Sequence, residues 1–236
     1  MRSIGKSFAW FQAIYSFNIA ANRINTGASS YLFHSKLFNK PHHAAIRVAL
    51  VMQAFLISTG IVALAEMGDK TQLLALVLAA RFKQPWLIVA GIFVATLLNH
   101  AAAGALGAWV TTQISPQTLR YILGASFIAM AAWMLVPDKL GDAADKKAPR
   151  FGVFGTTVVL FFLAEMGDKT QIATVMLAAR FDAYFAVVAG TTLGMMLANA
   201  PVVWLGERMT RLVPLRVVHL VSAAVFLALG LWALLS

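Results

Sequence analysis

One string of eight residues, A-E-M-G-D-K-T-Q, occurs twice in this chain, at residues 65–72 and 164–171. The similarity extends beyond the string, because residues 65–82 and 164–181 are identical at 13 of 18 positions with a constant offset of 99. The same offset pairs Val-Ala-Gly at 89–91 with Val-Ala-Gly at 188–190. Such an internal repeat predicts two equivalent structural halves, each carrying one copy of the string.

Both strings lie inside long apolar segments, although they carry four of the nine acidic residues of the chain. With 60% hydrophobic residues, 12% charged residues and a mean hydropathy of +0.77, the composition is that of an integral membrane protein. A charged side chain at the bilayer centre costs about 2.5–3.5 kcal/mol on insertion scales, and such residues usually mark ion or proton pathways. A bound cation is the obvious compensation for this cost.

The chain contains no cysteine and carries a formal net charge of +10. Without thiolates, a metal must be bound by oxygen or imidazole ligands, which favours hard cations. The Lys and Arg residues are scattered among short loops beside apolar segments, as the positive-inside rule places them, and they form no basic stripe. We therefore expect the basic residues to face the lipid bilayer surface, and we predict no nucleic-acid partner.

Each half contains three apolar segments, which predicts a six-helix core. The segments cover residues 47–81, 85–111 and 118–136, and then 151–180, 183–205 and 214–235. The apolar stretches on either side of the second string are each shorter than the about 20 residues that cross a bilayer. Joined, they cross once, with a kink or local unwinding at Gly167, as at Gly68 in the first copy. The alternative is an eight-segment chain in which each motif is a loop between two short helices.

Three spans per half is an odd number, so the second half must enter the membrane from the opposite side. The expected fold is an all-α integral membrane protein built from two inverted three-helix repeats, 47–137 and 151–236, which often share a binding site near the midplane. The excess of Lys and Arg on one side predicts that the charged linker 138–150 is cytoplasmic in a multi-pass inner-membrane protein. Residues 1–46 are an N-terminal extension, either signal-like or a peripheral helix.

Glu66 and Asp69 are three residues apart, so both project from one face of a helix, as do Glu165 and Asp168. With nearby hydroxyl and amide oxygens, these four carboxylates can form an all-oxygen cage, which suits Mn2+, Ca2+ or Mg2+ better than Zn2+ or Cu2+. The predicted metal ligands are Glu66, Asp69, Glu165, Asp168, Thr71, Thr170, Gln72 and Gln171.

Each motif also contains a lysine, Lys70 or Lys169, directly after its aspartate. These lysines can neutralise carboxylates until a cation arrives, and the net charge of −2 over the two motifs balances one divalent cation. Crowded carboxylates also bind protons, which predicts proton-coupled antiport. The competing interpretation is structural, with buried salt bridges from Glu66 to Lys70 and from Glu165 to Lys169. A purely structural pair, however, has no reason to recur with its Gly and Thr-Gln intact.

Three further polar residues, Asn99, His100 and Asn199, lie in the second span of a half, and His100 and Asn199 are 99 positions apart. They either contribute a ligand or relay near the motifs or, as is more common, form interhelical hydrogen bonds. His219, in the last span, is expected to be a packing residue.

The strings E-M-G-D-K-T at 66–71 and 165–170 resemble the E-x-G-D-K-[ST] signature of the Gdt-one family of cation transporters. The similarity covers roughly residues 48–235. It implies a six-helix core of two inverted repeats, exchange of Mn2+ or Ca2+ for H+, and Glu66, Asp69, Glu165 and Asp168 as cation-binding residues. In a compact chain of bacterial type it favours export of Mn2+ from the cytoplasm, with no bound cofactor. The N-terminal extension departs from the family pattern.

Two other transport classes fit part of the pattern. An exporter of amino acids or other small organic solutes would use an acidic site to bind amines in a larger cavity, and a passive channel would use acidic residues as a filter. An enzyme is not expected, because the motifs offer no nucleophile with an adjacent base and no HExxH metal motif. The choice between Mn2+ and Ca2+, the proton stoichiometry and the oligomeric state are not encoded in these patterns.

Overall fold

A computed structural model describes residues 41–136, 151–206 and 215–235, and every regular element in this part of the chain is a helix. In the first half the helices are α3 (Pro41–Glu66), α4 (Lys70–Phe82), α5 (Pro85–Gln113) and α6 (Pro116–Met134). In the second half they are α7 (Gly152–Glu165), α8 (Lys169–Phe181), α9 (Tyr184–Leu205) and α11 (Leu215–Leu235). The predictions for residues 1–40 and for the linker 138–150 lie outside the described residues.

The chain divides into two compact units, Met1–Val51 and Met52–Ser236. Within the described residues, the first unit contains only the start of α3. The second unit contains the rest of α3 and all the other helices, and it carries both motifs.

Among the described residues, four helices are long and apolar enough to cross a membrane, which is consistent with the predicted all-α membrane protein. They are Ala45–Glu66, Pro85–Gln113, Tyr184–Leu205 and Arg216–Leu235, with mean hydropathies of 1.6 to 2.2. The predicted spans that lack a motif agree with α5, α6, α9 and α11 to within two residues at each end.

The two motif-bearing segments are each divided into two helices. In the first half the helix ends at Glu66 and restarts at Lys70, and in the second it ends at Glu165 and restarts at Lys169. The physical reason lies in the glycine, because Gly68 has φ 86° and Gly167 has φ 77°, a left-handed conformation that interrupts a helix and suits glycine. The break thus goes further than a kink and gives eight helices in the described part of the chain.

The two halves pack against each other through contacts that repeat with the offset of 99. A Cβ on Gly91 would lie 2.7 Å from Thr157 Cβ and 3.1 Å from the Phe154 carbonyl oxygen. A Cβ on Gly190 would lie 3.1 Å from Ser58 Cβ and 2.5 Å from the Phe55 carbonyl oxygen. Each of these contacts thus has a counterpart in which the roles of the two halves are exchanged.

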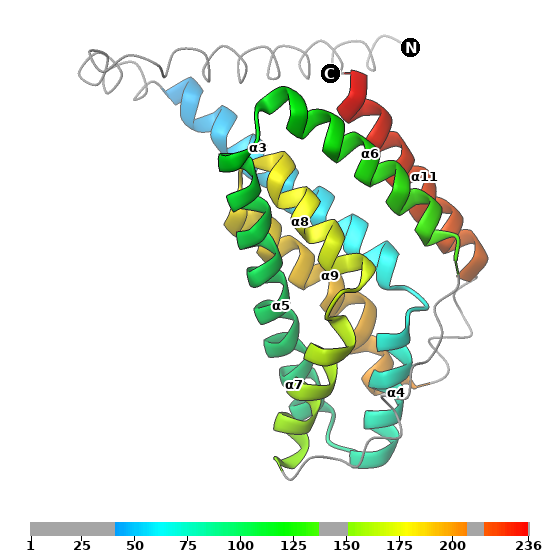
Figure 1. Cartoon of the computed structure of the whole chain (residues 1–236). Helices are drawn as coiled ribbons and strands as arrows, with labels where there is room; N and C mark the ends of the chain where they lie inside the picture. The colour runs from blue at the N-terminus through cyan, green and yellow to red at the C-terminus, as the bar shows by residue number, and fades with distance from the viewer. Residues whose placement is uncertain (1–40, 137–150, 207–214, 236) are drawn as a thin grey trace. The chain divides into compact units, whose positions relative to one another are not determined.

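These contacts also give the helix directions. Gly91 and Gly107 of α5 approach Phe154 in α7 and Val175 in α8, so α5 runs parallel to the α7–α8 pair. Only two residues separate α4 from α5, which turns back along it. The broken helices of the two halves therefore run in opposite directions, as can be followed in Figure 1.

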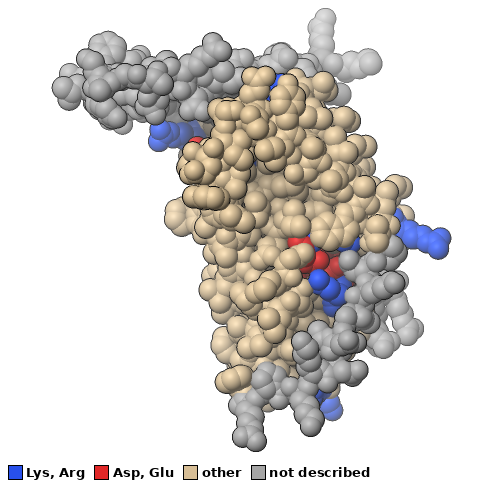
Figure 2. Space-filling view, in the orientation of Figure 1, with Lys and Arg blue, Asp and Glu red and all other residues tan. Residues whose placement is uncertain are grey.

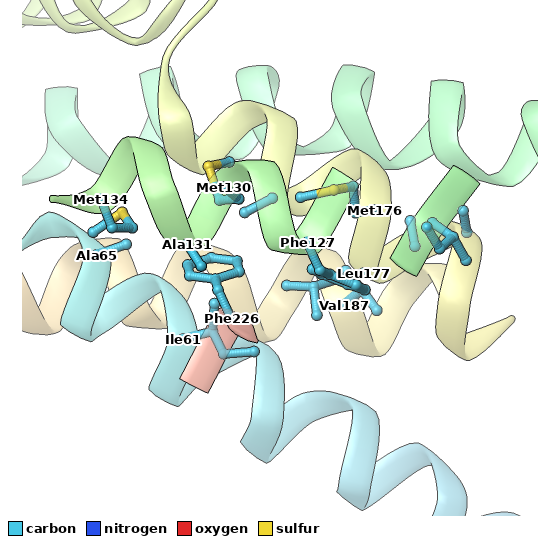
Figure 3. Close-up of a cluster of buried hydrophobic side chains, with 14 of the residues drawn as sticks. Ile61, Ala65, Phe127, Met130, Ala131, Met134, Met176, Leu177, Val187 and Phe226 are labelled. Atoms are coloured by element: carbon cyan, nitrogen blue, oxygen red, sulfur yellow. The ribbon is translucent and has the colours of Figure 1, made fainter. Parts of the chain in front are cut away.

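A buried apolar cluster holds the motif helices against α6 and α11. Phe127 of α6 and Phe226 of α11 have ring centroids 6.2 Å apart, and Leu177 of α8 and Ala65 of α3 belong to the same cluster (Figure 3). Ala65 directly precedes Glu66. The cluster therefore fixes the end of α3, where the first carboxylate of the motif projects.

The close helix approach at Gly190 yields a prediction about stability. Gly190→Ala places a methyl group against the backbone of α3, and we expect it to lower the free energy of unfolding by about 1–3 kcal/mol. Gly60→Ala is the matched control, because a Cβ there has no atom within 4 Å and alanine favours a helix by about 0.5–1 kcal/mol. Thermal unfolding of the two variants in detergent measures the difference, and equal effects would contradict the packing described here.

Candidate cation site

The four motif carboxylates lie at the broken helix ends. Glu66 and Glu165 are the last residues of α3 and α7, whereas Asp69 and Asp168 are the N-cap residues of α4 and α8. Neither aspartate side chain caps its own helix, although the helix N-terminus favours a negative charge there. Each break therefore presents two carboxylates, one at the end of the first helix and one at the start of the next.

The carboxylates of the two halves meet inside the protein. One oxygen each from Glu66, Asp69 and Asp168 lies within 4.8 Å of the others, and the side chains are between 0 and 4% exposed. Glu165, the remaining motif carboxylate, is fully buried as well. The cluster thus brings together carboxylates from both motifs, while their role as metal ligands stays a prediction.

Each motif threonine holds one oxygen of its own glutamate. Thr71 Oγ1 donates to Glu66 Oε2 at 2.7 Å, and Thr170 Oγ1 donates to Glu165 Oε2 at 3.1 Å. The second oxygen of each glutamate, Oε1, is buried and accepts no hydrogen bond from the described residues. A buried carboxylate oxygen without a donor is costly, and a cation is the partner that fits it.

The motif glutamines connect each loop to the other half. Gln72 Oε1 accepts from the Gly68 N–H at 2.9 Å, while its Nε2 donates to the Ala198 carbonyl in α9 at 2.8 Å. Gln171 Oε1 accepts from the Gly167 N–H at 2.7 Å, while its Nε2 lies 3.4 Å from Asn99 Oδ1 in α5. Positions 99 and 198 are equivalent in the repeat, so each glutamine contacts the same position of the opposite half. Gln72 contacts a backbone carbonyl there, and Gln171 contacts a side chain.

The motif lysines differ in their contacts. Lys70 Nζ lies 3.2 Å from Asp168 Oδ1, so the ion pair joins the halves instead of linking Lys70 to Glu66 within one copy. This differs from the intramotif pairing considered from the sequence, because the helix break separates Glu66 from Lys70. Lys169 Nζ donates to the Val136 carbonyl at 3.1 Å and lies 6.0 Å from the Trp133 ring centroid, at the end of α6.

Of the other polar residues singled out from the sequence, Asn99 is tied to a motif. Besides contacting Gln171, it donates to the Phe162 carbonyl of α7 at 3.1 Å. Asn199 donates to the Met195 carbonyl of its own helix, and His100 is completely buried. The carbonyl of Ala198 had no signal in the sequence, because any residue at that position supplies the same backbone oxygen.

Charged side chains are few on the face of the molecule drawn in Figure 2. There, acidic side chains gather beside Lys and Arg side chains within a broad uncharged surface. Buried carboxylates, an ion pair between the halves and long apolar helices are together typical of a membrane protein with an ion or proton pathway.

Comparison with known proteins identifies the family. Residues 54–142 and 153–236 match the family model described as divalent cation/proton antiporter GDT1, so the chain belongs to the GDT1 family and is a cation transporter. It is 50% identical over 182 residues to the "Putative manganese exporter" of Vibrio cholerae, covering 77% of this chain and 90% of that protein.

More distant relatives belong to photosynthetic organisms. The chain is 29% identical over 163 residues to the GDT1-like protein sll0615 of Synechocystis, covering 61% of this chain and 78% of that protein. It is 26% identical over 202 residues to GDT1-like protein 3 of indica rice, covering 75% and 72%, respectively. No solved structure gives a significant match to the chain.

Proposed function

We propose that this protein exports divalent cations, chiefly Mn2+, from the cytoplasm across the inner membrane in exchange for protons. The observation that carries the proposal is the buried cluster in which Glu66 and Asp69 of one half meet Asp168 of the other. The cation is the substrate, and its proposed ligands are the four motif carboxylates, supported by the oxygens of Thr71, Thr170, Gln72 and Gln171.

The donor set supports a divalent, hard cation. The motif side chains offer oxygen donors, and carboxylate, hydroxyl and amide oxygens suit Mn2+, Ca2+ and Mg2+. The relative from Vibrio cholerae carries manganese in its name, which supports Mn2+ as the principal substrate. Ca2+ is the second candidate, since it accepts the same ligands.

Proton exchange is supported by the crowding of the carboxylates. Carboxylates crowded in a buried cluster repel one another when they are ionised, which favours the binding of protons when the metal leaves. The family description, a divalent cation/proton antiporter, fits this exchange. Protons and metal then compete for one set of oxygens, and each is released when the other binds.

The equivalent contacts that each half makes with the other support alternating access. We propose that the halves are inverted repeats about an axis in the membrane plane, with the broken helices meeting near the midplane. The cross-half contacts of Gln72, Gln171 and Lys70 all change when one half rocks against the other. Exposure of the carboxylates to one side of the membrane at a time follows from that motion.

Transport by the purified protein in liposomes under an imposed pH gradient tests the proposal. We expect the gradient to drive Mn2+ strongly, Ca2+ more weakly, and Mg2+ least, because Mg2+ gives up its water shell reluctantly. Proton movement, followed with a pH-sensitive dye, should accompany the metal. Movement of radiolabelled amino acids without any metal movement would instead support the alternative, an exporter of small organic solutes.

A further inference from the structure

A second group of buried polar side chains lies between α5 and α9, apart from the motif carboxylates. We call this group the polar seam. It consists of Thr96, His100, Thr192 and Asn199. The seam lies in the contact between α5 and α9, two helices that belong to different halves.

The register of the two helices places these residues on facing surfaces. A Cβ on Gly104 of α5 would meet Val188 of α9 at 2.9 Å, so these positions face each other. His100 and Thr96 precede Gly104 by four and eight residues, so all three lie along one i±4 ridge of the α5 surface. Thr192 follows Val188 by one turn, and Asn199 follows it by about three turns on the same face.

The seam residues are almost completely inaccessible and lack protein partners for key atoms. Thr192 is 4% exposed, and the other three are between 0 and 1% exposed. The hydroxyls of Thr96 and Thr192, both ring nitrogens of His100 and the Oδ1 of Asn199 have no hydrogen-bond partner among the described residues. A buried polar group without a partner is unfavourable, and buried water usually satisfies such groups.

Both ends of the seam adjoin a motif. His100 follows Asn99, which Gln171 of the second motif contacts at 3.4 Å. Asn199 follows Ala198, whose carbonyl accepts from Gln72 of the first motif at 2.8 Å. Each end of the seam is thus one residue away from a position that a motif glutamine contacts.

We propose that the seam holds a chain of ordered water molecules and carries protons to and from the motifs. This inference rests on the proposed proton exchange and deepens it by naming a route. A hydroxyl accepts one hydrogen bond and donates another, and an imidazole accepts at one nitrogen and donates from the other. A proton that enters at one end therefore moves by successive transfer, with one proton released at the far end and no net change in the chain. Asn199, anchored through Nδ2 to its own helix, supplies an acceptor for the last water.

In this proposal protons and cations move through different parts of the protein. The cation occupies the carboxylate cluster, whereas the seam has hydroxyl, imidazole and amide groups and no carboxylate. Protons can thus leave the surroundings of the motifs along the seam while the metal enters the cluster by another path. Removing the seam hydroxyls should consequently impair exchange of metal for protons more than exchange of metal for metal.

Two isosteric substitutions test this separation in proteoliposomes. For the double variant Thr96→Val and Thr192→Val, we expect Mn2+ uptake driven by a pH gradient to fall at least 10-fold. We expect exchange of Mn2+ for Mn2+ at equal pH, which needs no net proton movement, to stay within twofold. Thr157→Val is the matched control, because Thr157 is also buried but donates to the Val153 carbonyl of its own helix at 2.8 Å. It should leave both rates within twofold.

A parallel fall of both rates, or no change in either, would overturn the proton route. Absence of pH-driven Mn2+ movement in the unaltered protein would instead refute the proposed function, and the proton route with it. Hydration is measured separately, by polarisation transfer from water to 15N-labelled histidine rings in solid-state NMR of the membrane-embedded protein. Rapid transfer to a ring signal that His100→Gln removes is the expected result, and slow transfer would overturn the hydrated seam.

Discussion

Glu66→Gln should reduce Mn2+ affinity by about 100-fold or more and abolish proton-driven Mn2+ transport, because the number of charged ligands sets cation affinity over orders of magnitude. The substitution keeps the size of the side chain and its bond to Thr71 while removing one negative charge from the buried cluster. Glu165→Gln, at the equivalent position, should behave in the same way. Equilibrium dialysis with 54Mn measures the affinity, and the liposome assay measures transport.

The control for this prediction is Asp182→Asn. Asp182 is an acidic residue outside both motifs, in the turn between α8 and α9, and its φ of 45° is a conformation that asparagine tolerates well. We expect this variant to bind and transport Mn2+ within twofold of the unaltered protein. If Glu66→Gln also stayed within twofold, the motif glutamate would not be a cation ligand and the proposed site would be wrong.

Lys70→Met should have the second-largest effect, and it should raise Mn2+ affinity where Glu66→Gln lowers it. Lys70 Nζ lies 3.2 Å from Asp168 Oδ1, so a cation that uses this carboxylate must displace the ammonium group. Removing Lys70 leaves the carboxylate without its counter-charge, which is unfavourable until a cation binds. We expect Mn2+ affinity to rise about 10-fold, one power of ten being about 1.4 kcal/mol, and turnover to fall because metal release slows.

Binding and transport by Lys70→Met should therefore change in opposite senses. Lys83→Met provides the control, since Lys83 lies in the exposed turn after α4 and belongs to neither motif. Equal affinities for Lys70→Met and Lys83→Met would show that the ion pair between the halves does not compete with the cation.

The sequence was sufficient to predict the helical class and most helix boundaries. The spans without a motif are long, apolar and bounded by turns, so their ends could be placed to within two residues. The extent of the break in the motif helices was harder to predict, because a glycine in a helix either stays helical or adopts a positive φ. Gly68 and Gly167 adopt positive φ angles of 86° and 77°, and three residues of each motif are therefore not helical.

The doubled motif was sufficient to predict which residues form the candidate site, but not which of them contact each other across the two halves. The spacing of Glu66 and Asp69 shows that they lie close together, because that spacing is local. The contact between Lys70 and Asp168 depends on how two halves that are 99 residues apart pack against each other. The link from Gln72 to the Ala198 carbonyl was likewise invisible, since a backbone oxygen carries no residue signature.

Although the two motifs are identical in sequence, the polar groups that surround them differ. Gln171 contacts the side chain of Asn99, whereas Gln72 contacts the backbone carbonyl of Ala198. A substitution of Asn99 therefore removes the partner of Gln171, but a substitution of Ala198 leaves the carbonyl that Gln72 contacts. His100 and Asn199 differ in a similar way at equivalent positions. The halves share an architecture while differing in the polar groups beside each motif.

Anomalous diffraction from crystals of the Mn2+-loaded protein, recorded at the manganese absorption edge, tests the central claim most directly. The account predicts one manganese peak coordinated by carboxylate oxygens of both halves, with Glu66, Asp69 and Asp168 among its ligands. A peak bound by one half alone, or a peak away from both motifs, would contradict a shared cation site.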